Sequence, residues 1–192
     1  MGGIKNIEIN EEWLYHAVNS RVIDKIVLTG HILSRNMQKK YGLRPKKGNN
    51  IWNGNHFISL SKKNEETGSS YTHYSQGLFA LIVDDVDAIK TEQKHPDIVW
   101  EYVSKLPINK RYSYWKDEYQ VRDAIPLDKV VGIKIPSKKD GFWPVLDHAE
   151  NEEEMKKFID KVEKLDFDVP YIDVDEGKVI EQDSIRDYMR KR

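Results

Sequence analysis

The chain has 192 residues, of which 39% are hydrophobic, which is enough for one hydrophobic core and too little for two roomy domains. Its 31 Lys and Arg residues nearly balance 32 Asp and Glu, so overall charge gives no reason to expect bulk attraction to nucleic acid or membranes. The chain contains no cysteine, which excludes disulfides, thiolate metal sites and a cysteine nucleophile.

No hydrophobic run approaches the roughly 20 residues that a membrane-spanning helix requires. The first ten residues, MGGIKNIEIN, contain no apolar signal core. We therefore expect a cytoplasmic protein without membrane contact. Secretion or injection as an effector is the alternative.

The first elements are predicted as a strand followed by a helix. WLYHAV is rich in aromatic and aliphatic residues, as is typical of a strand, and places His16 near its end. In NSRVIDKIVLTG, Ser20 is the predicted N-cap, Gly30 ends the helix, and one face carries Val22, Ile23, Ile26 and Val27. A short second helix is expected in ILSRNMQKKYG, before the turn-rich segment LRPKKGNNIWNGN.

Two strands and a helix are predicted in the middle of the chain. In HFISLSK, Ile58 and Leu60 alternate with Ser59 and Ser61, so the serines are expected to point away from the core. GLFALIVDDV is a continuous apolar run, which is typical of a buried central strand. DIVWEYVSKL has helical spacing and ends at Pro107.

The last third contributes two strands, YQVRDAIP and VVGIKIP, then an amphipathic helix in EEEMKKFIDKVEKL, a hairpin in YIDVDEGKVIEQ and a short basic helix. Strands with interspersed helices predict an α+β fold. We expect a core over residues 1–145, with residues 146–192 as a helix-hairpin-helix extension packed on the same domain.

The sequence contains no dinucleotide-binding glycine motif, no phosphate-binding P-loop motif and no HExxH zinc motif. Its histidines lack metal-ligand spacing with acids on one helix face, so no metal is expected. A histidine beside an apolar run is most often a packed core residue, and that interpretation of His16 is kept beside the one that follows.

The order of the motifs resembles the ADP-ribosyltransferase superfamily, in the branch with a His, Tyr and Glu triad. His16 on a first strand precedes a small residue, Ala17, and a helix that ends in glycine, although the family commonly has glycine at the position of Ala17. GNHFISLSKKNEETGSSY resembles the second block with a somewhat long spacer, and YWKDEYQVRD resembles the third. The resemblance covers roughly residues 13–136 and implies a split, strongly twisted β core with flanking helices.

The resemblance implies a binding role for each block. His16 would bond the adenosine-side ribose of NAD, with main-chain groups at Ala17 holding the nicotinamide amide. Tyr71, next to Ser70, would stack on the nicotinamide ring. Tyr74 would form a second wall beside that ring, and Ser59 or Ser61 would line the floor of the cleft. The alternative is that these tyrosines are half-buried amphipathic surface residues.

Glu118 is the predicted catalytic carboxylate, with His16 and Tyr71 as the rest of the triad. Strand alternation places Glu118, Gln120 and Arg122 on one face. In the family this glutamate holds a ribose hydroxyl and stabilises positive charge at the anomeric carbon, a task suited to a fixed carboxylate. The alternatives are an exposed glutamate paired with Lys116 or Arg122, and a register in which Asp117 faces the cleft.

The resemblance implies a mono-ADP-ribosyltransferase, a glycosyltransferase that uses NAD as substrate, releases nicotinamide and modifies an unknown protein, nucleic acid or small molecule. Acceptor recognition would involve Tyr112, Tyr114, Trp115 and Gln120. A bacterial toxin, effector or phage-defence role fits the size. The alternatives are an inactive module of the same fold that binds NAD or another nucleotide ligand, and an interaction domain in which the three residues coincide by chance.

Overall fold

The computed structural model describes residues 3–44, 56–62, 79–90, 118–136 and 148–192, and for residue 118 and residues 148–151 the description covers the backbone. Its main feature is a nine-stranded sheet in the order β1-β11-β10-β9-β5-β2-β4-β7-β6. These strands are β1 (Ile4–Asn6), β2 (Leu14–Val18), β4 (Phe57–Ser61), β5 (Phe79–Val83), β6 (Ile89–Lys90), β7 (Glu118–Arg122), β9 (Val130–Lys134), β10 (Tyr171–Asp173) and β11 (Lys178–Ile180).

A second, two-stranded sheet pairs β3 (His31–Leu33) with β8 (Ala124–Pro126). The helices are α1 (Ile23–Thr29), α2 (Arg35–Lys40), α6 (His148–Lys164) and α7 (Ile185–Lys191), with 3-10 turns η2 (Leu127–Lys129) and η4 (Gln182–Ser184). No helix among the described residues is long and apolar enough to cross a membrane. The predicted α+β fold, with a split, twisted core and flanking helices, is confirmed.

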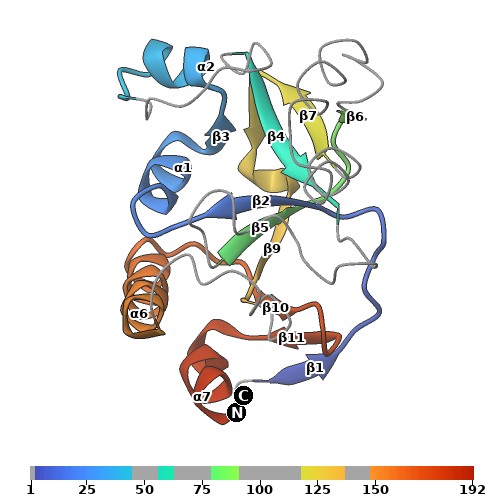
Figure 1. Cartoon of the computed structure of the whole chain (residues 1–192), viewed down its shortest axis with the longest axis vertical. Coiled ribbons are helices and arrows are strands. Elements are labelled where there is room, and N and C mark those ends of the chain that lie inside the picture. Colours follow the sequence, from blue (N-terminus) through green and yellow to red (C-terminus); the bar gives the residue numbers. More distant parts are fainter. Residues whose placement is uncertain (1–2, 45–55, 63–78, 91–117, 137–147) are drawn as a thin grey trace, which may run out of the picture.

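The large sheet consists of two parts that meet at a single backbone bridge. β2 pairs with β5 through five residue pairs, and β4 pairs with β7 through five, whereas among the residues described here β2 and β4 share one pair, Tyr15 with Ser61. In Figure 1, β4, β7 and β6 occupy the upper part of the molecule, while β2 and β5 cross below them at a steep angle. The sheet is therefore split between β2 and β4, and we call this junction the seam.

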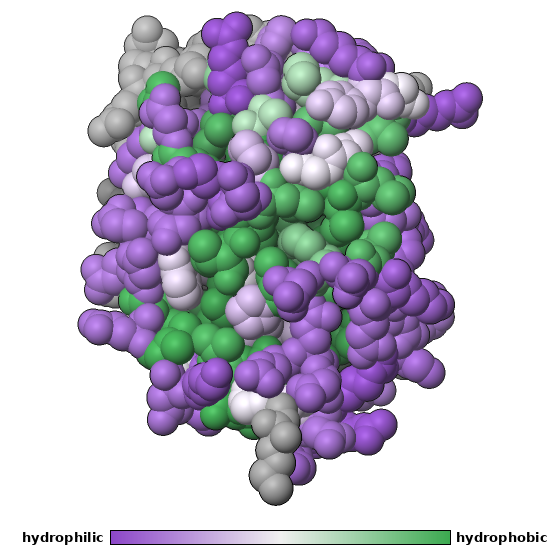
Figure 2. Space-filling view, turned by 180° about the vertical axis from the view of Figure 1, so that it is seen from behind, coloured by the Kyte–Doolittle hydropathy of each residue, from purple (hydrophilic) through white to green (hydrophobic). Residues whose placement is uncertain are grey.

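The buried strand β5 lies at the centre of the core. All five residues of β5 are buried, as the continuous apolar run predicts. On one side the Phe79 ring stacks on Phe158 of α6, with ring centroids 4.2 Å apart. Ile82 belongs to a second cluster with Tyr15 and Ile172. Both faces of the sheet therefore contribute to the core. Figure 2 shows the opposite side of the molecule, where hydrophobic side chains gather in the middle of the face with polar ones around them.

The C-terminal segment extends the same sheet. β10 runs parallel to β9, β11 returns antiparallel, and β1 pairs with β11 at the outer edge. The carboxylate of Asp173 is 1% exposed and lies 3.0 Å from the Arg192 guanidinium, and the hydroxyl of Tyr188 donates to it at 2.8 Å. A buried carboxylate requires such partners. The predicted hairpin and closing helix are therefore present, and the division at residue 145 stays a prediction.

The predicted N-cap of α1 is wrong. Residue 22 occupies the cap position and makes no side-chain cap hydrogen bond, although Gly30 ends the helix in the left-handed conformation as expected. Ser20 instead donates its backbone N–H and its hydroxyl to the Glu154 carboxylate of α6, at 2.7 and 2.9 Å. Ser20 therefore bonds to a residue 134 positions away in sequence and does not cap α1. This contact fixes the turn that follows β2.

Glu154→Ala should lower the free energy of unfolding by about 1–3 kcal/mol, because it leaves two donors at the buried Ser20 without their acceptor. Urea denaturation measures the effect. The matched control is Glu153→Ala, since Glu153 is exposed and pairs with Lys157 one turn along the helix. This control should change stability by less than about 0.5 kcal/mol. Equal losses in the two variants would contradict a fixing role for Glu154.

Candidate functional site

The candidate site lies at the seam, where predicted site residues of three neighbouring strands come together. Ser61 ends β4 and stands opposite Tyr15 of β2 on one side and Glu118 of β7 on the other. Ser59, two residues earlier on β4, stands opposite Gln120. The strand order β2-β4-β7 thus brings His16, both serines and the backbone of Glu118 into one region.

His16 contacts the neighbouring half of the sheet through its ring. Its Nδ1 lies 3.1 Å from the main-chain carbonyl of Ser59, beyond the single bridge. A carbonyl oxygen only accepts, so Nδ1 carries the proton in this contact and Nε2 is left as an acceptor when the ring is neutral. The imidazole therefore joins β2 to β4 at a point where the two strands no longer pair.

The neutral form of His16 is favoured in the folded protein. Burial lowers the pKa of the imidazole below its ordinary value of 6.5, and the bond to the Ser59 carbonyl opposes this shift only partly. Near neutral pH the ring consequently offers one N–H donor and one free acceptor. That combination suits a ligand hydroxyl, which can donate to Nε2.

The faces of the strands separate His16 from Glu118. The register places Glu118 on the same face as Ser61 and Tyr15, whereas His16 alternates to the face of Leu14 and Val18, with its ring turned into the seam. Asp117, the alternative catalytic carboxylate, lies outside the described residues.

The two serines differ in exposure. Ser59 is exposed as expected, but Ser61 is only 6% exposed, so the prediction that both point away from the core is wrong for Ser61. Its hydroxyl lies 3.5 Å from the Tyr15 carbonyl, at the edge of hydrogen-bonding distance. Burial follows from position, because Ser61 sits at the bridge where β2 covers it. The alternation of residues within β4 does not predict where β2 crosses this strand.

Gln120 is buried, at 3% exposure, and its Oε1 has no hydrogen-bond partner among the described residues. A buried acceptor without a partner is uncommon in folded proteins. Its predicted contact with an acceptor substrate stays a prediction. Ala17 is half-buried beside His16. Several predicted site residues lie outside the described residues, namely Ser70, Tyr71, Tyr74, Tyr112, Tyr114 and Trp115.

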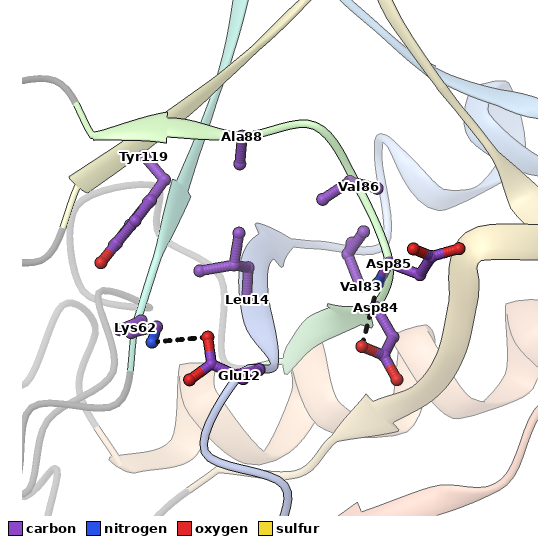
Figure 3. A pocket seen from close by; sticks show the side chains of 9 residues that line it. All are labelled: Glu12, Leu14, Lys62, Val83, Asp84, Asp85, Val86, Ala88 and Tyr119. Atoms are coloured by element: carbon purple, nitrogen blue, oxygen red, sulfur yellow. Dashed lines mark hydrogen bonds and ion pairs between the residues drawn. The ribbon is translucent and has the colours of Figure 1, made fainter.

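A cavity of about 330 Å³ opens beside the seam (Figure 3). Its walls come from the start of β2, the residue after β4, the start of β7, and the end of β5 with the segment that follows it. Lys62 pairs with Glu12 at 3.1 Å and lies 5.8 Å from the centroid of the Tyr119 ring. Asp84, at the opposite side, accepts from the Trp13 indole at 3.2 Å. This cavity lies on the Leu14 face of β2, which is also the face of His16.

Sequence reasoning missed Lys62, Tyr119 and Asp84 as lining residues of this cavity. Each adjoins a predicted strand end, and polar residues at strand ends were the available signal. In the part of the chain described here, no group of three or more His, Asp or Glu residues is arranged to hold a metal ion, and the absence of a metal stays a prediction.

Lowering the pH should destabilise the protein through His16. A histidine whose pKa is depressed on folding contributes stability above its unfolded pKa and loses it as pH falls below about 6.5. His16→Asn keeps an N–H donor near Ser59 and removes the titrating group. Urea denaturation near pH 7.5 and near pH 5, values chosen to bracket the ordinary histidine pKa of about 6.5, should therefore show a larger loss for the wild type than for the variant. Parallel losses would contradict the depressed pKa.

No family model and no curated protein matches the sequence. Among solved structures, the chain is similar to Thermus sp. 2.9 DarT in complex with NAD+, at 13% identity and a TM-score of 0.40, over 78% of this chain and 91% of that one. The complex with carba-NAD+ gives 15% identity and 0.38, over 80% and 93%. The complex with ADP-ribosylated ssDNA gives 12% and 0.38, over 81% and 93%. Likeness at this level concerns the outline of the fold, so function is inferred from this chain's own residues.

Proposed function

We propose that the protein is an NAD-dependent ADP-ribosyltransferase that binds NAD in the seam between β2 and β4. The observation that supports this most is the single bridge between Tyr15 and Ser61, with the His16 ring reaching across it to Ser59. Beyond the bridge, the described residues of β4 form no ladder with β2, and the main-chain groups at this edge of β2 would bind an amide of the substrate.

His16 would bind and orient the substrate. With Nδ1 bonded to Ser59, the ring is held in one tautomer, and Nε2 accepts from a ribose hydroxyl. This role requires the neutral imidazole, which burial favours. The packed-core interpretation and the ligand interpretation of His16 are therefore compatible, because one ring nitrogen serves the fold and the other the substrate.

The carboxylate at the start of β7 would act on charge that develops during the reaction. The bond between the ribose anomeric carbon and the nicotinamide nitrogen breaks, and its electron pair leaves with nicotinamide. The positive charge left on the ribose is stabilised by Glu118, and a nucleophile of the acceptor then forms a bond to the anomeric carbon and loses its proton. Tyr71 as the stacking residue, the identity of the acceptor and a toxin, effector or phage-defence role stay predictions.

Glu118→Gln should reduce the rate of nicotinamide release by at least about a hundredfold and change the NAD dissociation constant only a few-fold, because the carboxylate acts mainly in the transition state. Nicotinamide is measured by chromatography after incubation with NAD. Glu8→Gln is the control, since Glu8 is an exposed glutamate on the segment before β2. Full activity of Glu118→Gln would refute its role. Loss in Asp117→Asn instead would assign the role to Asp117.

His16→Asn should reduce the stabilisation that NAD confers. The variant keeps a donor for Ser59 and lacks the Nε2 acceptor, so affinity should fall by about tenfold, the effect of one lost hydrogen bond. Thermal melts with and without NAD measure it, with His56→Asn as control, because His56 precedes β4 at the end away from Ser61. An unchanged NAD increment in His16→Asn would rule out the ligand role.

The thermal melts with and without NAD, together with the measurement of nicotinamide release, separate the three functional alternatives. NAD stabilisation together with nicotinamide release supports the enzyme. Stabilisation without release supports an inactive binding module, and the absence of both supports an interaction domain.

A further inference from the structure

The cavity of Figure 3 has two polar ends with an apolar floor between them, and none of the residues that line it is a predicted site residue. Asp84 and Asp85 lie at one end, and Lys62 lies at the other. Tyr119 follows Glu118 on β7, and successive strand residues alternate between faces, so the cavity lies on the opposite face from the predicted catalytic position. We call it the Asp84 cavity.

The charges at the Lys62 end of the Asp84 cavity cancel. The Lys62 ammonium pairs with the Glu12 carboxylate at 3.1 Å and lies 5.8 Å from the centroid of the Tyr119 ring. Its positive charge is thus already engaged by a carboxylate and by an aromatic face. An anionic ligand would have to displace Glu12 and would meet the two aspartates at the other end, so the cavity does not suit an anion.

The Asp84 end of the cavity retains one negative charge. Asp85 pairs at 2.5 Å with Lys129, which stands outside the lining. Asp84 accepts the Trp13 indole N–H at 3.2 Å and the backbone N–H of Asp85 at 2.9 Å. Both donors are neutral, and within the described part of the chain no cation forms an ion pair with Asp84. Its carboxylate is therefore oriented by hydrogen bonds, while no direct contact balances its charge.

The turn that carries Asp84 is anchored. The backbone N–H of Asp84 donates to the Lys129 carbonyl at 3.0 Å, which ties the end of β5 to η2. The Trp13 indole holds the carboxylate from the segment before β2. A carboxylate held in this way loses little freedom when a ligand binds, which lowers the entropic cost of binding.

The floor of the Asp84 cavity is apolar. It consists of Leu14, Val83, Val86 and Ala88, of which Leu14 and Val83 are buried members of the core. Figure 3 shows Leu14 between the two polar ends. A hydrocarbon chain placed on this floor would leave water, which is favourable. A single carboxylate beside such a floor suits a ligand that has a cationic head and a hydrocarbon body.

The arrangement of the acids favours an organic cation over a metal ion. Hard metal ions require several oxygen ligands that converge on one point, whereas Glu12 lies across the cavity from the two aspartates. A planar guanidinium fork needs both oxygens of a carboxylate, and each oxygen of Asp84 already accepts one N–H. An ammonium group is a compact charge that can donate to either oxygen, so it fits this carboxylate best.

We propose that the Asp84 cavity binds a primary alkylammonium group, with the ammonium at Asp84 and the hydrocarbon chain on the floor of Leu14 and Val83. Two sources supply this chemistry, a free aliphatic amine and the lysine side chain of a polypeptide. The inference does not depend on the proposed enzymatic activity, because binding of an amine is measurable without NAD.

The probe is n-butylammonium, titrated by NMR at constant ionic strength. The Trp13 indole N–H signal is the readout, and the signal that disappears in Trp13→Phe identifies it. Because this N–H donates to Asp84, a cation at Asp84 should shift its signal. The wild type should show a saturable shift with a dissociation constant of about 1 mM, the scale expected for so small a ligand.

Two related compounds separate the contributions of charge and chain. The neutral n-butanol has the same chain without the charge, and methylammonium has the charge without the chain. Each should bind at least about tenfold more weakly than n-butylammonium, because the first loses the charge-assisted hydrogen bond and the second loses the apolar burial.

Asp84→Asn should weaken n-butylammonium binding by at least about tenfold, since the amide keeps an acceptor oxygen for Trp13 and removes the charge. The matched control is Asp87→Asn, which removes the same charge from an exposed position outside the cavity lining. It should change the affinity by less than about twofold, because exposed charges are screened. Thermal melts verify that both variants are folded.

A further titration identifies the source of the ammonium group. Nα-acetyl-lysine amide presents the lysine side chain as a polypeptide does. If it binds at least as tightly as n-butylammonium, the cavity takes a lysine side chain. If it is excluded while n-butylammonium binds, the cavity takes a free amine. Both results support the ammonium site.

Four outcomes would overturn the proposal. They are the absence of a saturable shift in the wild type, equal affinity for n-butanol and n-butylammonium, equal affinity of the wild type and Asp84→Asn, and an equal loss in Asp87→Asn. The comparison of n-butanol with n-butylammonium uses the wild type alone, so it tests the site even if Asp84→Asn does not fold. Nicotinamide release, measured separately, decides the proposed enzyme without bearing on these outcomes.

Discussion

The divergence of β2 from β4 is the constraint on which the rest of the candidate site depends. A continuous ladder between these strands would satisfy their backbone groups internally and leave no space between them. Here the ladder is reduced to Tyr15 and Ser61, and the imidazole of His16 takes the carbonyl of Ser59. The same side chain thus supplies a contact between the strands where the ladder is interrupted, and its Nε2 is the atom that the proposed function assigns to a ribose hydroxyl.

Elements remote in sequence support this arrangement. The turn after β2 is held by Glu154 of α6, and α6 is held against the sheet by the stacking of Phe158 on Phe79 of β5. β5 in turn pairs along the whole length of β2. The position of His16 is therefore set by the ladder to β5 on one side of its strand and by the anchored turn at the end of that strand.

Local patterns in the sequence predict the elements that local forces determine. The apolar run of β5, the alternation in β4, the amphipathic α6 and Gly30 as the end of α1 are all present in the structure. These elements predict the fold class and the order along the chain of the strands that carry the candidate site residues. The short strands β1, β3 and β6 had no such signal, since two or three residues are too few to show a period.

The prediction failed where a distant partner decided the outcome. Serine is a common N-cap residue, yet Ser20 donates its backbone N–H and its hydroxyl to the Glu154 carboxylate of α6. The alternation within β4 predicts that Ser61 is exposed, yet Ser61 is buried because it lies at the end of β4 where β2 crosses.

The single bridge also has a mechanical consequence. In a fully paired sheet, moving one half relative to the other breaks a row of backbone hydrogen bonds at once, and the sheet responds as one stiff body. Among the described residues, the polar contacts between β2 and β4 are one bridge, the contact of His16 with Ser59 and the long contact of the Ser61 hydroxyl with the Tyr15 carbonyl. A change in the distance between these two strands would therefore break fewer backbone hydrogen bonds than a change within either half, and it would leave the ladders of both halves intact.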